Sequence, residues 1–385
     1  MFGSARLRRY ALACAVALLL VAARASAQTE AQARAVAARF APVFYQGLDE
    51  ARHDYLTNFD FDGDWRGDNN WAHADDERFP LKAYVYYAVS ETATHYFIHY
   101  AVFHPRDYKG GSGGRILSNI INEGVKRGGR FDPTGRSAEA TVAHENDMEG
   151  CLVVVAKQGG DIERARVVYV ETLAHNRFLK YTAATEDSAN AASAKLEGGP
   201  DDDRKNADDG KNVVTLDGER PRLYVEPKGH GIAAYRDDKQ RPRGSVLRYE
   251  YGGRAAVPAP GAETVSYDLV PLLTTLWPRA QQGVGETYGL VTDYGQVSVS
   301  VVGSKGRTQA HALNLGALGS AFLGAVGGHN MARPPWGWFD NKERSAAPGS
   351  WFFDPAATVK RHFKLGADFG VAYVRQPFLG VGAQR

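Results

Sequence analysis

The alternation of apolar and polar residues predicts a protein built mainly from β-strands. Residues 83–90 ("AYVYYAVS") and 95–103 ("HYFIHYAVF") are aromatic and β-branched, and a short polar turn separates them. This pattern is typical of a β-hairpin. Residues 151–156 and 165–173, on either side of "KQGGDIER", predict a second hairpin.

Three further segments complete the regular elements that we expect. The Ala-rich residues 29–41 have helical spacing and predict a short helix. Residues 222–227 predict a strand that ends at Pro227, because proline cannot donate to the strand ladder. Residues 295–303 alternate with period two, as a half-exposed strand does.

Two long segments interrupt the strand pattern and predict loop insertions. Residues 108–140 are rich in Gly and basic residues around a short helical pattern, "ILSNIINEGV". Residues 183–220 are acidic and rich in Ala and Gly, and they have too few apolar residues to offset the entropy of ordering. Their acidic run, "GGPDDDRKNADDGKN", is either a solvated loop or a cation site, and composition favours the loop.

The C-terminal part of the chain has a different composition. Residues 316–331 are small and apolar, and a segment dense in Pro, Gly and Trp follows. Buried aromatic residues are usually packing, so we expect a structural flap that closes one end of the fold. The alternative is a binding wall for sugar or lipid, with Trp336 and Trp338 as its contact residues.

The N-terminus has the pattern of an export signal. Three arginines precede the apolar run "ALACAVALLLVAA", and "ASA" before Gln28 fits a cleavage site near Ala27. The apolar run is shorter than the roughly 20 residues of a membrane span, and no other stretch approaches that length. We therefore expect residues 1–27 to be a signal peptide, the protein to be periplasmic or extracellular, and the mature chain to lack a transmembrane segment.

Removal of that signal changes the charge balance. Four of the 46 basic residues lie in residues 1–27, so 42 remain against 44 acidic residues. The mature chain thus has no basic field to attract nucleic acid. One cysteine, Cys151, is left, and its apolar neighbours predict a buried and inert thiol.

The stretch "HENDMEG" (residues 144–150) places charged and ligating side chains directly before an apolar strand. Side chains alternate along a strand, so Asp147 and Glu149 should share the face that Cys151 continues. His144 has the wrong parity and can join them only if the chain turns near Asn146, a residue that suits turns. Glu145 should then face solvent.

Two carboxylates, one imidazole and water suit Mg²⁺, Mn²⁺ or Ca²⁺, whereas Zn²⁺ usually takes more nitrogen or sulfur ligands. The alternative is a cluster of salt bridges at the edge of the fold. Unpaired charge at a buried strand is costly, and this cost favours a functional site.

Other polar groups follow predicted strands, and loops at the ends of strands commonly build sites. Each is a weak signal alone, and their recurrence strengthens it: His99, His104, Asp107, His175, Glu226 and His230. Asp60, Asp62, Asp64 and Asp68 resemble a calcium loop, but Gly63 and Trp71 break the EF-hand spacing. A different cation site and a network of Asx turns remain as alternatives there. The sequence contains no G-x-S-x-G, P-loop or H-E-x-x-H motif.

Three motifs, "YAVFHPRD", "HENDMEG" and "RPRLYVEPKGHGI", resemble the necrosis- and ethylene-inducing-peptide-like proteins and the related vacuolar protein sorting-associated protein 62 family. The resemblance covers residues 40–235. Ala143 and Met148 stand where the second motif has Gly and Trp, and the paired cysteines of the necrosis-inducing group are missing. The resemblance implies a divalent cation at the matching positions: Asp107, His144, Asp147 and Glu149, with His230 beside them.

The fold that we expect is all-β: a jelly-roll-like β-sandwich over residues 28–385, as one domain, with residues 304–385 packed on it as a C-terminal extension. The resemblance implies a cytolysin-like protein that uses the cation to recognise a sugar or lipid headgroup at a cell surface. The alternative is a metal-dependent hydrolase, a phosphoesterase or glycan-cleaving enzyme that acts on a small-molecule substrate. Its catalytic residues would be His144, Glu149 and His230.

Overall fold

The computed structural model describes residues 29–108, 143–184, 212–236, 245–303, 305–326, 330–343 and 345–382. The expected signal peptide lies outside these residues, as do nearly all of the segment 108–140 and most of the segment 183–220. Part of the second segment is not loop: β7 (Val213–Asp217) is a strand there. In the described residues, no helix has the length and apolar character needed to cross a bilayer.

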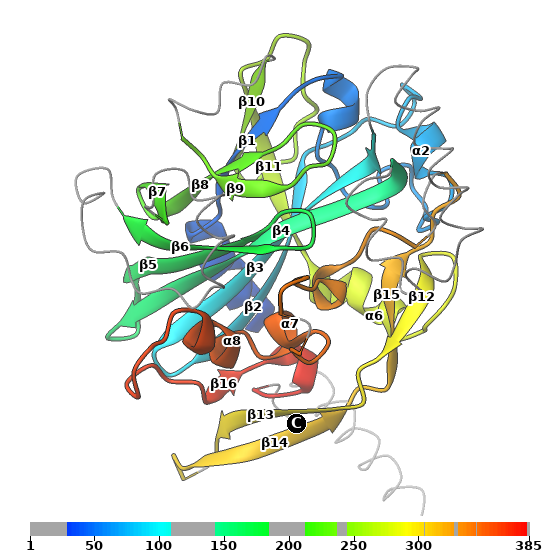
Figure 1. Ribbon diagram of the computed structural model, residues 1–385. Helices are drawn as coiled ribbons and strands as arrows, with labels where there is room; N and C mark the ends of the chain where they lie inside the picture. Colours follow the sequence, from blue (N-terminus) through cyan, green and yellow to red (C-terminus); the bar gives the residue numbers. More distant parts are fainter. Residues whose placement is uncertain are drawn as a thin grey trace, which may run out of the picture.

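The all-β prediction is confirmed, because strands make up most of the regular structure (Figure 1). The other strands are β1 (Val43–Gly47), β2 (Tyr84–Thr92), β3 (His95–Asp107), β4 (His144–Gln158), β5 (Asp161–Leu173), β6 (Phe178–Ala184), β8 (Arg220–Val225), β9 (Ile232–Ala234), β10 (Val246–Tyr251), β11 (Thr264–Pro271), β12 (Tyr288–Asp293), β13 (Gln296–Val302), β14 (Thr308–Asn314), β15 (Ala317–Phe322) and β16 (Tyr373–Arg375).

The helical elements are short. Residues 29–39 are helical, as the spacing predicts. The others are η1 (Ala51–Asp54), α2 (Asn70–His73), η4 (Leu272–Thr274), α6 (Leu276–Ala280), η5 (Pro335–Gly337), α7 (Ser350–Phe353), α8 (Pro355–His362) and η6 (Pro377–Leu379).

The two predicted hairpins form the centre of the main sheet. β2 to β6 are consecutive antiparallel neighbours. β2 to β5 are each longer than their apolar patterns indicated, and β6 was not predicted. From β6 the sheet continues through β7, β8, β1 and β10 to β11, and β11 also pairs with β2. The path therefore returns to its start, and the two sides of this circuit enclose a core.

That inner core explains the alternation along the central strands. One face of β2 to β6 packs against residues of β1, β8, β10 and β11 in a single cluster of buried side chains. On β4 the inward residues include Cys151, Val153 and Val155. The Cys151 thiol is fully buried, as predicted, and burial raises its pKa above the ordinary range.

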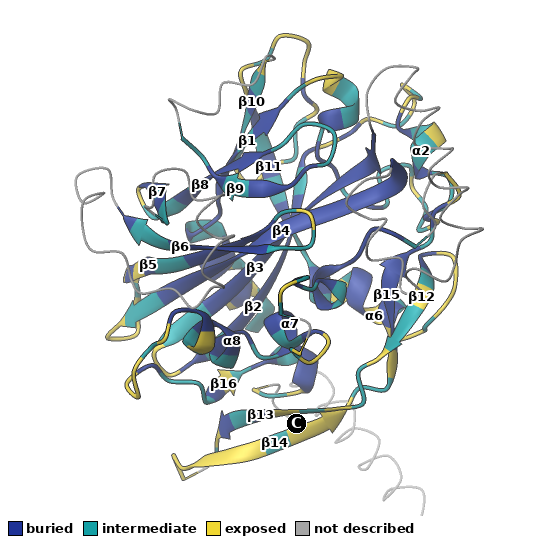
Figure 2. Ribbon diagram, viewed as in Figure 1, coloured by how far each residue is buried: buried dark blue, intermediate teal, exposed yellow. Residues whose placement is uncertain are grey.

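The opposite face of the central strands is covered as well. Phe97, Leu152 and Val154 belong to a second core cluster, to which the chain after residue 272 contributes most of the aromatic side chains. Figure 2 shows the resulting burial of β3 and β4 on both faces, whereas β14 at the rim is exposed. This double burial accounts for the near-continuous apolar runs in these strands.

The prediction of Trp336 as part of a binding wall is wrong. Its side chain is fully buried in the outer core, and its Nε1 donates to the carbonyl oxygen of Gly319 at 2.6 Å. The aromatic segment is a packing layer, which is the structural alternative that the sequence favoured. Trp351 is buried in the same layer and stacks on Phe178.

A buried ionic network fastens this outer layer to the sheet. His362 of α8 bonds Glu171 of β5 through Nδ1 at 2.7 Å and Glu343 through Nε2 at 2.9 Å. The indole of Trp351 donates to the second oxygen of Glu171. Burial alone would lower the pKa of His362, but the carboxylates of Glu171 and Glu343 outweigh that effect and raise it to about 8.

Because of the contacts of His362 with Glu171 and Glu343, we expect the free energy of unfolding to depend on pH. The pKa of His362 is about 8 in the folded protein and 6.5 as an ordinary value, so its contribution is present below pH 6.5 and is lost as the pH rises through 8. The loss should be about 2 kcal/mol in the free energy of unfolding, measured by urea titration from pH 6 to 8.5.

The matched variant is His362→Gln. Its free energy of unfolding should fall by about 2 kcal/mol less than that of the wild-type protein between pH 6 and 8.5. A residual slope is expected from His230, whose pKa is also raised. Equal slopes for the wild-type protein and the variant would contradict the role of the network.

Candidate functional site

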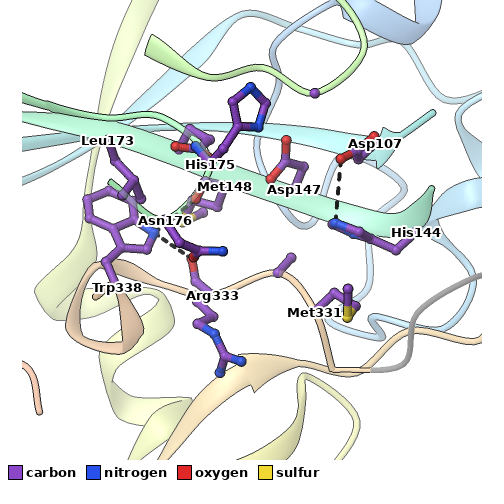
Figure 3. A pocket seen from close by; sticks show the side chains of 13 residues that line it. Asp107, His144, Asp147, Met148, Leu173, His175, Asn176, Met331, Arg333 and Trp338 are labelled. Atoms are coloured by element: carbon purple, nitrogen blue, oxygen red, sulfur yellow. Dashed lines mark hydrogen bonds and ion pairs between the residues drawn. The ribbon is translucent and has the colours of Figure 1, made fainter. Parts of the chain in front are cut away.

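The candidate site lies at a free edge of β4. The pairing of β4 with β5 ends at Cys151 and Thr172, whereas its pairing with β3 continues to His144 and Asp107. A small cavity of about 40 Å³ opens beside this unpaired edge. It is lined by Asp107, His144, Asp147, Met148, Glu149, Leu173, His175, Asn176, Gly229, Met331, Ala332, Arg333 and Trp338 (Figure 3).

The cavity brings together all the residues predicted as cation ligands. Asp107 comes from the end of β3, and His144, Asp147 and Glu149 come from the start of β4. Asp147 and Glu149 have the same parity as the inward residue Cys151, as the alternation predicts. The segment is part of β4 itself and is not a loop that precedes it, because β4 begins at His144.

Asn146 has a φ of 61°, which lies in the left-handed region, although it sits within β4. The turn expected here is absent, because the pairing of β4 with β3 keeps one register from Asp147 to His144. The side-chain amide of Asn146 donates to the carbonyl oxygens of Gly67 and Leu323, both at 2.8 Å, and its Oδ1 accepts from Asn70 at 2.7 Å. Asn tolerates this conformation better than most residues, and here three buried hydrogen bonds hold it in place.

Glu145 does not face solvent, so that expectation is wrong. Its side chain is buried, and its carboxylate accepts hydrogen bonds from the backbone N–H groups of Trp71, Ala325 and Val326. These donors belong to segments about 75 and 180 residues away in sequence, which no local pattern reveals. Glu145 thus ties β4 to loops on both sides.

His144 has the geometry of an oriented metal ligand. Its Nδ1 donates to the backbone carbonyl oxygen of Asn146 at 2.7 Å, which leaves Nε2 as the ring nitrogen directed at Asp107. This Nε2 lies 3.7 Å from Oδ2 of Asp107 (Figure 3). Histidines that bind metals commonly donate their other ring N–H to a backbone carbonyl or a carboxylate.

His230 lies behind the cavity and positions Asp147. Its Nδ1 bonds Oδ2 of Asp147 at 2.9 Å, and its Nε2 lies 3.5 Å from Oδ1 of Asp54. Burial lowers the pKa of His230, but the two carboxylates outweigh burial and raise it to about 9. The ring of His104 stacks on it at 3.6 Å, and burial and the charge of His230 hold the pKa of His104 well below its usual range.

Asp54 is the residue of this site that sequence analysis missed. It ends η1, is fully buried, and accepts hydrogen bonds from the backbone N–H of Asp49 and Lys228 and from the hydroxyl of Tyr108. No motif surrounds it, because its partners come from three separate parts of the chain. Its role is visible only once the fold is known.

Glu149 carries the least compensated charge of the site. Its Oε1 accepts only a long hydrogen bond from the backbone N–H of His175, at 3.4 Å, and its Oε2 is buried and accepts none from the described residues. Burial and the neighbouring Asp147 raise its pKa well above the ordinary value. An acceptor left in this state destabilises a fold unless a ligand supplies the missing partner.

The remaining candidates lie elsewhere or support the site. His99 faces the outer layer, bonds the carbonyl of Trp351 and is not part of the cavity. Trp338 lines the cavity, and its Nε1 donates to the carbonyl oxygen of Met148 at the free edge of β4. Gly150 makes this packing possible, since a Cβ there would collide with the indole of Trp338.

The aspartates before α2 form their own hydrogen-bond network. Asp60 accepts from Asn58, and Asp62 bonds Nδ1 of His73 at 2.5 Å. Asp64 accepts from the side chain of Asn69 at 3.0 Å. Asx turns, one of the two alternatives for this segment, are present as well, since the backbone N–H groups of Asp64 and Arg66 donate to Asp62 and Asp64.

The residues of the cavity are better suited to a cation that keeps some water ligands than to one bound entirely by protein atoms. Among the described residues, no three His, Cys, Asp or Glu side chains are close enough together to hold a metal ion by themselves. Mg²⁺ usually keeps several waters and takes only one or two carboxylates directly. A water needs about 10 to 15 Å³ of such space, so the cavity has room for roughly three.

No protein-family model and no curated protein matches this chain. Among solved structures, it is similar to one described as a toxin fold for microbial attack and plant defense, at 16% identity, with 52% of this chain and 67% of that chain covered and a TM-score of 0.26. NLPPya in complex with glucosamine gives the same values.

A third solved structure is Necrosis and Ethylene inducing Protein 2 from the causal agent of cocoa's Witches Broom disease. It is 12% identical, with 61% of this chain and 72% of that chain covered, at a TM-score of 0.25. These TM-scores and identities are low, so the likeness does not decide what this chain binds.

The conformation of Asn146 leads to a stability prediction. Asn146→Ala should lower the free energy of unfolding by about 3 to 5 kcal/mol, because it forces Ala into the left-handed region and leaves buried partners unsatisfied. Asn146→Gly loses the same hydrogen bonds without the conformational strain, so it should be less destabilised by about 1 kcal/mol. Equal urea midpoints for the two variants would show that the backbone conformation is not under strain.

Proposed function

We propose that this protein is an exported, divalent-cation-dependent binding protein that recognises a sugar or lipid headgroup at a cell surface. The observation that carries the proposal is the orientation of His144. Its Nδ1 is committed to a backbone carbonyl, and its Nε2 lies 3.7 Å from the carboxylate of Asp107. This orientation brings an imidazole nitrogen and a carboxylate oxygen to the same side of the cavity, where both could bind one cation.

The charge balance of the cavity supports a cation. Asp107, Asp147 and Glu149 line it, and the imidazolium of His230 lies behind Asp147, where Asp54 also faces it. Arg333 lines the cavity from the outer layer, but its guanidinium points away from Asp107 and Asp147 (Figure 3). A divalent cation would offset the acidic excess, and Mg²⁺, Ca²⁺ and Mn²⁺ all accept oxygen ligands with one imidazole.

The size of the cavity favours binding at its mouth. A space of about 40 Å³ accommodates an ion with a few waters, but a sugar ring is too large for it. A glycan would therefore lie over the opening and replace waters of the cation with its hydroxyl oxygens. The motif resemblance stated above implies the same class of ligand.

A metal-dependent hydrolase is the second candidate, because several imidazoles converge on the carboxylates. In that case Glu149 would be the acid or base, with His144 and His230 as the other candidates. Both histidines are buried and bonded within the protein, at 5% and 0% exposure of their side chains. This burial favours an orienting role for them and hence the binding function.

Metal analysis of the mature protein tests the proposal. After dialysis against Mg²⁺, Ca²⁺ or Mn²⁺, we expect one equivalent of one of these ions, and Asp107→Asn and Glu149→Gln should each weaken its affinity at least tenfold. Asp217→Asn, an exposed acid that pairs with Arg248, is the control and should bind normally.

Function is then measured with liposomes that carry glycosylated lipids, with and without the ion. Association that needs the ion supports the proposal. A wild-type protein that retains no more ion than Glu149→Gln would contradict it, and turnover of an ester, phosphodiester or glycoside that Glu149→Gln abolishes would establish the hydrolase instead.

A further inference from the structure

The turn between β5 and β6 has an unusual residue at its tip. Ala174 and Arg177 exchange backbone hydrogen bonds, and the two residues between them, His175 and Asn176, have φ values of 50° and 58°. Two left-handed residues in a two-residue hairpin loop define the type I′ turn, for which Asn-Gly is the preferred sequence. A histidine in this position is less favourable than Asn or Gly.

The loop after β8 is shaped around the same ring. Oε2 of Glu226 bonds Nε2 of His175 at 2.7 Å. A Cβ on Gly229 would lie 3.0 Å from Cε1 of His175, and a Cβ on Gly231 would lie 3.1 Å from its Nε2. Two loops that are distant in sequence therefore position one imidazole at the cavity.

Stability does not account for this arrangement. The side chains of His175 and Glu226 are 43% and 46% exposed, and exposed ion pairs contribute little to folding. A His in a left-handed turn and two glycines in the facing loop each lower stability slightly. Several such losses of stability occur together at one cavity, and this indicates a function for the imidazole of His175.

His175 differs from the other imidazoles of the site in its access to solvent. His144 and His230 are buried, whereas His175 stands at the mouth and its ring lies near Asp147 (Figure 3). Since Nε2 is held by Glu226, the free position of the ring is Nδ1. No hydrogen bond from Nδ1 to another described residue is present.

We propose that His175, positioned by Glu226, contacts the ligand at the mouth of the cavity. Its Nε2–H donates to Glu226, so its Nδ1 accepts a hydrogen bond from a sugar hydroxyl. This inference rests on the proposed function, since the cation would hold other hydroxyls of the same sugar. The ligand is a neutral polyol, because Asp107, Asp147, Glu149 and Glu226 surround the opening with negative charge and disfavour an anion.

The test separates ligand contact from cation binding. Mn²⁺ affinity is measured by electron paramagnetic resonance, and binding of glucose, mannose, glucosamine and inorganic phosphate is measured by NMR on the Mn²⁺-free and Mg²⁺-loaded protein. His175→Ala should reduce sugar affinity about tenfold, as expected for the loss of one hydrogen bond, with Mn²⁺ affinity and the urea midpoint unchanged.

Two variants refine the result. His175→Asn keeps a side-chain acceptor, the amide oxygen, and suits the left-handed turn, so it should recover part of the sugar affinity. His73→Asn removes another imidazole that bonds a carboxylate, at Asp62 outside the cavity, and should leave both affinities unchanged.

Each other outcome overturns the inference. Undiminished sugar binding by His175→Ala would remove the contact, and a clear fall in its urea midpoint would make the turn a stability element. Binding of phosphate in place of sugar would refute the neutral polyol. Failure of the wild-type protein to bind Mn²⁺ or Mg²⁺ would instead contradict the proposed function, which keeps the two results distinguishable.

Discussion

The structure depends on one constraint: β4 is covered on both faces, yet one of its edges is free beyond Cys151. Water has little access to the polar groups at this buried edge, so other segments of the protein must supply their hydrogen-bond partners. Trp338 donates to the carbonyl of Met148, and Glu145 collects three backbone N–H groups. Oε2 of Glu149 has no such partner among the described residues, and this incomplete compensation defines the site.

The C-terminal layer and the cavity are therefore linked through packing. The same aromatic layer that buries the outer face of β4 also supplies Trp338 and Met331 to the cavity. Its attachment rests partly on the buried contacts of His362 with Glu171, because an uncompensated charge there would be strongly unfavourable. Weakening the contact between His362 and Glu171 should therefore displace the outer wall of the cavity, although neither residue lines the cavity itself.

Strand alternation was sufficient to predict part of the site. It placed Asp147 and Glu149 on one face. It also required a turn at Asn146, whereas the structure has a left-handed φ there within an unbroken strand register. Alternation could not place Glu145, because its partners lie in loops distant in sequence, nor could it find Asp54, which no pattern marks. It also could not separate buried Trp336 from Trp338 at the cavity, since both lie in one aromatic segment.

A buried salt-bridge cluster is the main alternative to a cation, and the geometry argues against it. A cluster that served stability would pair its charges, as Glu171, His362 and Glu343 do. Beside the cavity, His230 already lies between Asp54 and Asp147, and Oε2 of Glu149 accepts no hydrogen bond from the described residues. In the described part of the chain, the cluster around His362 therefore compensates its own charges, whereas the cluster at the cavity leaves Glu149 uncompensated.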